Sequence, residues 1–480
     1  MPRFFLILSI VGWVLILGLR AQTQTDKLRA DGPQQVNIVV MDIILSGNKV
    51  TKDFIMMREL EFNEGDTIPA GRFESKLTES KENLLNTSLF NFVTVKTDTL
   101  NKEDGFVLLN VKIDVIERWY IWPFPIFEFA DRNFNAWWKD KDFSKVNYGG
   151  FLEWDNFRGR KEVLKLLLRF GYDEKYQLYY EIPYINRKKT IGLGVGLDWS
   201  QSHEISYRTV NDTLQFFKAE DSYPRQELKL KSQLIYRPDI HNTHYAELSY
   251  SKISLMDTVL MLNPQYSAAG ETDIRYFALY YKYKSDFRDY APYPLEGYYF
   301  DVILNKYGLG LIRNNDLDVF TLQSTFRKYW KLSPRWYFAS LFTSQFSSKN
   351  EIPYMIQSGL GYHRVFVRGY ELYVIDGQKY GLFRSNIKFA LIPTRVFNID
   401  FIKTERFSKI HYAFYLNLFF DAGYAQDDQF SEMNRLSNQF LYGTGIGLDF
   451  VTYYDMVFRL ELSMNKQHET GVFIHFMAPI

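Results

Sequence analysis

The sequence predicts a mainly β protein, in which an antiparallel transmembrane β-barrel of about 16 strands follows one small α+β domain. Three observations predict this fold class: an aromatic-rich composition, a single long apolar segment, and repeated alternation of apolar and polar residues. Aromatic residues make up 18% of the 480 residues, including 35 Tyr and 41 Phe. Such residues form the girdles at the two interfaces of a membrane barrel.

Composition also excludes several classes of protein. Hydrophobic residues reach 46%, yet the mean hydropathy is −0.26, which excludes a membrane protein built from several apolar helices. The formal net charge of +1 gives no indication of a nucleic-acid partner. The chain has no Cys, which excludes disulfides, thiolate metal sites and Cys nucleophiles.

The first residues predict export. A short basic start, Met1 to Arg3, precedes an apolar stretch from Phe4 to Leu19, and the chain then becomes polar. We expect a secretory signal peptide over residues 1–22, since the stretch is shorter than the ~20 residues that a spanning helix needs. An uncleaved membrane anchor is the alternative, because Arg20 lies beside the expected cleavage site. No second segment of this kind follows, so any later membrane crossing must use strands.

Residues 35–117 predict a small domain with the order β-α-α-β-β. Apolar spacing and turn residues favour strands and helices over these approximate ranges: Val36 to Leu45, Thr51 to Leu60, Gly71 to Leu85, Phe90 to Thr97 and Phe106 to Val115.

Residues 119–480 predict the barrel. Alternation recurs along this region, for example from Phe320 to Arg327 and from Phe458 to Asn465. One such strand would also suit a soluble sandwich. However, the polar faces are densely charged in many strands, which favours lipid outside and water inside. About 16 strands leave about 23 residues for each strand with its connection, enough for a spanning strand of about 9–11 residues and a loop.

Two motifs in the barrel region predict a contact between a long loop and the inner wall of the barrel. Val-Arg-Gly-Tyr occupies residues 367–370, in a long connection from about Ser347 to Gln378, and Phe-Phe-Asp-Ala-Gly occupies residues 419–423. Alternation turns Asp421 toward the lumen, where a carboxylate needs a partner, and an Arg on an inward-folded loop supplies one. We expect Gly445 and Gly447 on the next strand to leave room for the loop backbone. The predicted loop-to-barrel lock comprises Val367, Arg368, Gly369, Tyr370, Phe419, Asp421 and Gly423.

The motifs carry a family resemblance. In the small domain, Gly47-Asn48, Glu64-Gly65-Asp66 and the run from Leu89 to Val93 resemble a polypeptide-transport-associated (POTRA) domain. Together with the two barrel motifs, they resemble the BamA/TamA-type outer-membrane assembly and translocation family, as a short member with one POTRA domain. The family commonly adds an inward Glu on the strand after the loop, where this chain has Asn386 and Lys388.

The resemblance implies an outer-membrane barrel that inserts or translocates proteins without ATP, with its N-terminal domain in the periplasm. Loop 349–378 would fold into the lumen, with Arg368 and Asp421 as the paired charges. The POTRA-like domain would receive clients by strand addition, although a passive spacer is the alternative. The implied partners are unfolded outer-membrane or secreted client proteins, outer-membrane lipid, and periplasmic chaperones or accessory lipoproteins. No nucleic acid, cofactor or metal is implied.

The first and last strands of the barrel predict a seam. Proline has no backbone N–H to donate to a neighbouring strand, so prolines at the start of the barrel predict that the first and last strands pair weakly and can separate sideways. The alternative is that these prolines mark the linker into the barrel. The expected seam residues are Trp122, Pro123, Pro125, Phe473 and Phe476.

A diffusion porin or a barrel hydrolase with a passive periplasmic domain is the competing function. The sequence has no G-x-S-x-G, H-E-x-x-H or G-x-x-x-x-G-K motif, so we expect no enzyme activity. His241 and His244 are close in sequence but lie in a turn-like stretch, which is weak evidence for a metal site.

Overall fold

The structure of this protein is a computed structural model that describes residues 36–103, 105–129, 146–312, 316–362, 364–452, 454–476 and 480. The predicted signal peptide therefore lies outside the described residues. The chain divides into two compact units: residues up to 44, 61–78 and 95–113 form one, and residues 45–60, 79–94 and 114–480 form the other. No helix in the described residues is long and apolar enough to cross a membrane.

The N-terminal region contains a four-stranded sheet with the order β2-β1-β4-β3. The α+β class is confirmed, with one addition. The short strand β2 separates the two helices and pairs antiparallel with the start of β1, from Asn37 opposite Pro69. The elements are β1 (Asn37–Ser46), α2 (Asp53–Met57), β2 (Thr67–Pro69), α3 (Ala70–Asn86), β3 (Phe90–Glu103) and β4 (Phe106–Glu117).

The core of this region is apolar. Phe73 and Leu77, one turn apart on α3, are buried, as are the alternate β4 residues Val111 and Ile113. The ring centroids of Phe73 and Phe62 lie 6.2 Å apart. The helix stripe and the inner face of the sheet thus bury apolar side chains together, as in a soluble domain.

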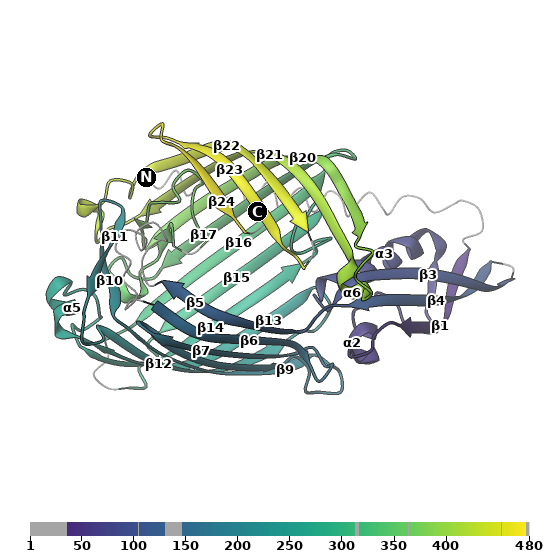
Figure 1. Cartoon of the computed structure of the whole chain (residues 1–480), viewed down its shortest axis with the longest axis horizontal. Helices are drawn as coiled ribbons and strands as arrows, with labels where there is room; N and C mark the ends of the chain where they lie inside the picture. Colours follow the sequence, from purple (N-terminus) through teal and green to yellow (C-terminus); the bar gives the residue numbers. More distant parts are fainter. Residues whose placement is uncertain are drawn as a thin grey trace. The chain divides into compact units, whose positions relative to one another are not determined.

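The second architecture is a 16-stranded antiparallel sheet, which confirms the predicted fold class and strand number (Figure 1). Consecutive barrel strands are neighbours throughout, and the register is continuous apart from irregularities such as those in β20. The strands are β5 (Ile121–Phe129), β6 (Val146–Phe157), β7 (Glu162–Gly171), β8 (Glu174–Ile182), β9 (Ile191–Ser202), β12 (Arg225–Tyr236), β13 (Asn242–Leu255), β14 (Asp273–Asp286), β15 (Gly297–Tyr307), β16 (Val319–Lys331), β17 (Trp336–Ser347), β20 (Lys379–Asn398), β21 (Lys409–Gln426), β22 (Phe440–Thr452), β23 (Val457–Asn465) and β24 (Thr470–His475).

Burial in this sheet is the reverse of that in a soluble protein. Along β23, Leu460 and Leu462 are exposed, whereas Arg459 and Glu461, which alternate with them, are buried. The exposed Leu462 lies opposite exposed Val472 on β24, so the apolar face continues across strands. An apolar outer face and a polar inner face are the pattern of a barrel that spans a lipid bilayer.

Short elements lie in the connections between barrel strands. They are β10 (Glu204–Val210), β11 (Thr213–Lys218), α5 (Asp257–Leu262), η2 (Tyr354–Ile356), β18 (Gly359–Leu360), β19 (Ile375–Asp376), α6 (Glu405–Ser408) and η3 (Ser431–Met433). The connection between β17 and β20 contains η2, β18 and β19, and we call its residues 348–378 the inner loop. Its two-stranded piece pairs Leu360 with Ile375, which fixes the loop's two arms side by side.

The two ends of the sheet are β5 and β24. In the residues that the structure describes, β24 pairs only with β23, and β5 pairs only with β6. Strand β24 comprises six residues, and β5 includes Pro123 and Pro125 opposite Leu152 and Gly150.

Candidate loop-to-barrel lock

A tight turn in the inner loop presents Arg368. The N–H of Tyr370 donates to the carbonyl oxygen of Val367 at 3.0 Å, which closes the turn around Arg368 and Gly369. Gly369 has φ +93°, a conformation that L side chains rarely adopt. The side-chain amide of Asn465 on β23 donates to the Gly369 carbonyl at 3.0 Å, which attaches the turn to the barrel wall.

Arg368 makes a two-point contact with Asp421 on β21. Its Nε donates to Oδ2 at 2.8 Å and its Nη2 to Oδ1 at 2.5 Å, and both side chains are 0% exposed. The backbone N–H of Arg368 also donates to Oδ2 of Asp421, at 3.1 Å. A planar guanidinium matches a carboxylate in this bidentate form, which is both strong and geometrically selective.

Further groups surround the guanidinium. Its Nη1 lies 3.3 Å from Oε1 of Glu461 on β23, and its Nη2 donates to Oδ1 of Asn386 on β20 at 2.7 Å. Its Cζ lies 3.9 Å from the centroid of the Phe419 ring. Burial acts to lower the pKa of Arg368, but the charge and hydrogen bonds of Asp421 outweigh it and raise the pKa above its ordinary value.

Two more arginines complete the buried charge cluster. Nε of Arg384 lies 3.5 Å from Oδ2 of Asp421, and Nε of Arg459 lies 3.0 Å from Oε1 of Glu461. Arg384 also donates through Nε to the carbonyl oxygen of Phe366 in the inner loop, at 3.1 Å. Loop and wall are therefore joined by shared charges, and removal of one would leave others buried without compensation.

Glycines on the barrel wall allow the close approach of the loop. A Cβ on Gly423 would lie 2.6 Å from Cγ2 of Val367, and one on Gly443 would lie 1.8 Å from the carbonyl oxygen of Arg368. The expectation that Gly445 and Gly447 receive the loop backbone was wrong. The nearest side-chain atoms to their missing Cβ positions belong to Phe419 and Asn417, so these glycines make room for wall residues.

The remaining lock residues are anchored on either side of Arg368. Val367 is fully buried in an apolar cluster with Leu360, Leu382 and Leu441. Tyr370 is also buried, and its hydroxyl donates to Oε1 of Gln467 at 2.6 Å. The structure thus brings all seven predicted lock residues to one place on the inner wall.

One important residue was missed from the sequence. Glu461 on β23 supplies a second carboxylate to Arg368, whereas Asn386 on β20 supplies an amide oxygen. Among the described residues, Lys388 makes no ion pair with the carboxylates around Arg368. Its Nζ lies 4.3 Å from the centroid of the Tyr293 ring. The polar alternation of β23 pointed Glu461 inward, but nothing local distinguished it from the other inward residues.

The expected seam residues lie on β5 and β24, except Phe476, which directly follows β24. The Trp122 ring packs against Phe124 and Tyr454, with centroids 5.9 and 5.1 Å apart. Phe473 lies opposite Glu461 in the register, and the Phe476 ring lies 5.4 Å from that of Phe458. The Trp122 ring thus contacts its own strand and the connection between β22 and β23, whereas Phe476 contacts β23.

The inner loop also holds a second buried carboxylate. Asp376 on β19 is fully buried and accepts a hydrogen bond from the hydroxyl of Tyr362. Burial, with the nearby charges of Asp427 and Asp212, raises the pKa of Asp376 to about 7. Unlike Asp421, it has no ion pair to a cation among the described residues.

The two histidines considered for a metal site contact different partners. Nδ1 of His241 lies 2.8 Å from the carbonyl oxygen of Asp286, and Nδ1 of His244 lies 2.8 Å from the Tyr281 hydroxyl. The one cluster of potential metal ligands within the described residues lies elsewhere and includes His475.

Comparison with known proteins adds a domain assignment. Residues 38–115 match the POTRA family, described as surface antigen variable number repeat. No curated protein matches the chain in sequence.

Solved structures with similar features include BamA from Haemophilus ducreyi lacking POTRA domains 1–3, with 16% identity, a TM-score of 0.48, and coverage of 92% of this chain and 83% of that chain. CdiB from Escherichia coli has 10% identity and a TM-score of 0.45, with 93% and 90% covered. CdiB from Acinetobacter baumannii has 14% identity and a TM-score of 0.46, with 91% and 72% covered.

Proposed function

We propose that this protein is an outer-membrane barrel of the BamA/TamA type that inserts or translocates proteins without ATP. The observation that carries the proposal is the combination of a POTRA domain with a barrel whose inner loop is fastened by Arg368 and Asp421. A passive diffusion pore needs neither feature. The predicted periplasmic position of residues 35–117 and the export signal of residues 1–22 belong to the same proposal.

The POTRA domain would receive clients along a sheet edge. Strand β3 lies at the end of the four-stranded sheet, and its second half is exposed. An edge strand presents unpaired backbone donors and acceptors, so an extended client segment can add to it regardless of its sequence. Strand addition therefore suits a protein that must bind many unfolded segments.

The lock would keep the inner loop fixed while the ends of the sheet exchange partners. Asp421, Asn386 and Glu461 lie on β21, β20 and β23, so Arg368 connects three strands near one end of the sheet. The other strand at that end, β24, is short and pairs with β23 alone among the described strands. We propose that β24 and β5 form a seam that opens sideways and pairs with a client strand, with the fastened loop supporting the wall beside it.

Depletion of the protein in its native host, followed by outer-membrane proteomics, tests the proposal. Broad loss of barrel proteins supports general assembly, and loss of one secreted species supports a dedicated transporter. An unchanged proteome contradicts both and favours a pore. Complementation with Arg368→Ala should fail, whereas Arg364→Ala, which alters an exposed arginine of the same loop, should restore the proteome.

The pairing itself is tested by a double-mutant cycle with Arg368→Ala and Asp421→Ala, read out as heat-modifiable mobility on gels. Because the two side chains share hydrogen bonds, we expect the double variant to be affected less than the sum of the single variants. Additive effects would contradict the lock.

A further inference from the structure

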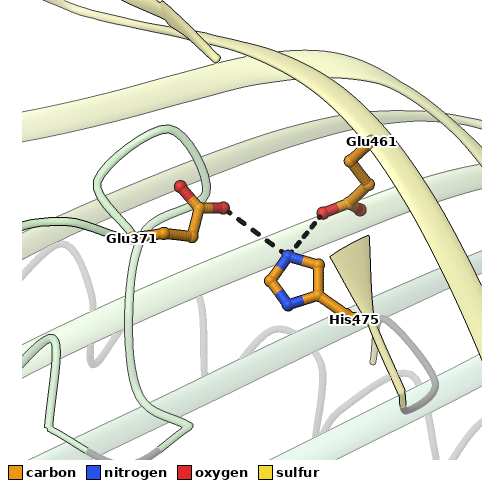
Figure 2. A group of neighbouring side chains, drawn as sticks. All are labelled: Glu371, Glu461 and His475. Atoms are coloured by element: carbon orange, nitrogen blue, oxygen red, sulfur yellow. Dashed lines mark ion pairs between the residues drawn. The ribbon is translucent and has the colours of Figure 1, made fainter. Parts of the chain in front are cut away.

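Three side chains from three separate elements converge beside the lock. They are Glu371 in the inner loop, Glu461 on β23 and His475 on β24, and Figure 2 shows the imidazole ring of His475 between the two carboxylates. Nε2 of His475 lies 3.4 Å from Oε2 of Glu461 and 3.8 Å from Oε1 of Glu371. The three ligand atoms all lie within 4.8 Å of one another.

Each carboxylate is held by one oxygen and offers the other. The N–H of Gly369 donates to Oε2 of Glu371 at 2.8 Å, which leaves Oε1 directed toward His475. Oε1 of Glu461 is held by Arg368 and Arg459, which leaves Oε2 directed to the same point. The arginines therefore compensate the side of Glu461 that faces away from the convergence point.

The converging atoms are buried and lack hydrogen bonds. The side chains of Glu461, Glu371 and His475 are 0%, 9% and 14% exposed. Among the described residues, Oε2 of Glu461, Oε1 of Glu371 and Nε2 of His475 have no hydrogen-bond partner. Buried polar atoms without partners are costly and uncommon, and here three of them point at one another.

A proton satisfies this arrangement less well than a metal ion does. A protonated imidazole has a single hydrogen on Nε2, which can make one well-aligned hydrogen bond or be shared less favourably between the two carboxylates. A cation at the centre would bind one lone pair from each of the three atoms. Ligand atoms at about 2.0–2.1 Å from a tetrahedral zinc ion lie about 3.3 Å apart, close to the spacing of His475 and Glu461.

We propose that Glu371, Glu461 and His475 form a binding site for a divalent transition-metal ion, with Zn²⁺ as the best match. One neutral imidazole and two carboxylates are ligands that zinc accepts, and three protein ligands leave a fourth position for water. Mg²⁺ and Ca²⁺ prefer shells made of oxygen alone, so the histidine selects against them.

The site would join the inner loop to the last strand. Glu371 follows the Val-Arg-Gly-Tyr turn directly, and His475 is the final residue of β24. The His475 ring also stacks on Phe366 of the inner loop, with centroids 5.8 Å apart and an interplanar angle of 19°. A bound ion would therefore tie together the loop, β23 and β24. This inference rests on geometry alone and does not depend on the proposed function.

Metal binding to the full chain in detergent micelles tests the proposal. The untagged protein is stripped with a chelator, dialysed against ZnCl₂, and analysed for zinc per chain by mass spectrometry. We expect one zinc per chain, retained in excess Mg²⁺, and visible d–d absorption of a tetrahedral centre when Co²⁺ replaces zinc. His475→Ala and Glu371→Gln should each weaken binding by at least about 10-fold, because each removes a ligand.

His468→Asn is the matched control, since it removes a nearby exposed histidine at a positive φ that Asn tolerates. It should bind zinc like the parent. Native heat-modifiable mobility identifies the variants that still fold. Two ligand variants are used so that the test remains possible if one of them fails to fold. Absence of stoichiometric zinc in the parent chain, or binding that survives both ligand variants, would overturn the proposal.

Discussion

The small domain and the barrel fill their interiors with opposite chemistry. In the small domain, the side chains of Val111 and Ile113 are buried, and exposed positions are largely polar. In the barrel, Arg368 and Asp421 are 0% exposed, whereas Leu418, three residues before Asp421, is 55% exposed. Both regions are built from alternating strands, so the local sequence pattern alone does not decide which face is buried.

This difference indicates which kind of interaction stabilises each region. An apolar interior gains free energy from the transfer of side chains out of water, whereas buried charges gain only when each has a partner with good geometry. The apolar face of the barrel strands is exposed, so the interior must be organised by specific polar contacts. Loss of a single interior contact should therefore be costly in both regions, for different reasons.

Arg368→Ala should have the largest effect. It removes the shared partner of Asp421 and Glu461 and leaves buried carboxylates with less compensation, which we expect to cost about 3–5 kcal/mol of the free energy of unfolding. Equilibrium unfolding in urea, with the protein in lipid vesicles, measures this cost. Arg364→Ala should change it little, and equal costs for the two variants would show that the buried pairing is not a source of stability.

Ile113→Ala tests the apolar interior of the small domain. The side chain is fully buried, so its truncation should cost about 2–5 kcal/mol through lost transfer free energy and a cavity. Hydrogen exchange of the β4 amides in the full chain measures the cost. Phe106→Ala on the same strand removes a half-exposed ring and should cost much less. Similar protection in both variants would contradict the assignment of an apolar core.

Leu418→Arg tests the outer face of the barrel. If this face contacts lipid, an Arg there should cost about 2–4 kcal/mol near the bilayer midplane and less near the interfaces. The control is Leu372→Arg, at a 79% exposed position in the inner loop, which should cost little. Unfolding in vesicles compares the two, and an equal, small cost would mean that the outer face does not meet lipid.

Much of the fold followed from the sequence because alternation is local. Runs such as Phe458 to Asn465 separated an apolar face from a polar face, and the dense charge of the polar faces in many strands then assigned the apolar faces to the outside. The strand number followed from a count of the alternating segments, and the chain length suits that number. The short strand β2 was missed because three residues between two helices carry too little pattern to be recognised.

The site was predictable only where a motif marked it. Arg368 and Asp421 lie in recognisable motifs, and the structure brings them within hydrogen-bond distance. Glu461, Glu371 and His475 carry no local signal, because their proximity depends on the register between β23 and β24 and on the path of the inner loop. The close approach at Gly443 was missed for the same reason, since it depends on where the loop backbone crosses β22.

The last expected effect concerns Asp376, the buried carboxyl that lacks a cation among the described residues. Its pKa is raised from an ordinary value near 4 to about 7, so between these limits the folded loop binds a proton that the unfolded chain has released. Stability of the inner loop should therefore fall as the pH rises from about 4 to about 7, and change little from this cause outside that window.

Hydrogen exchange of residues 364–378, corrected for the intrinsic pH dependence of exchange, measures this loss. Asp376→Asn should flatten the dependence, because the amide cannot ionise, whereas Asp428→Asn at an exposed position should leave it intact. A loop that becomes more stable over this range would reverse the sign and imply that Asp376 gains a cationic partner on ionisation. Asp376 would then follow the same rule as Asp421, as a buried carboxylate paired with a cation.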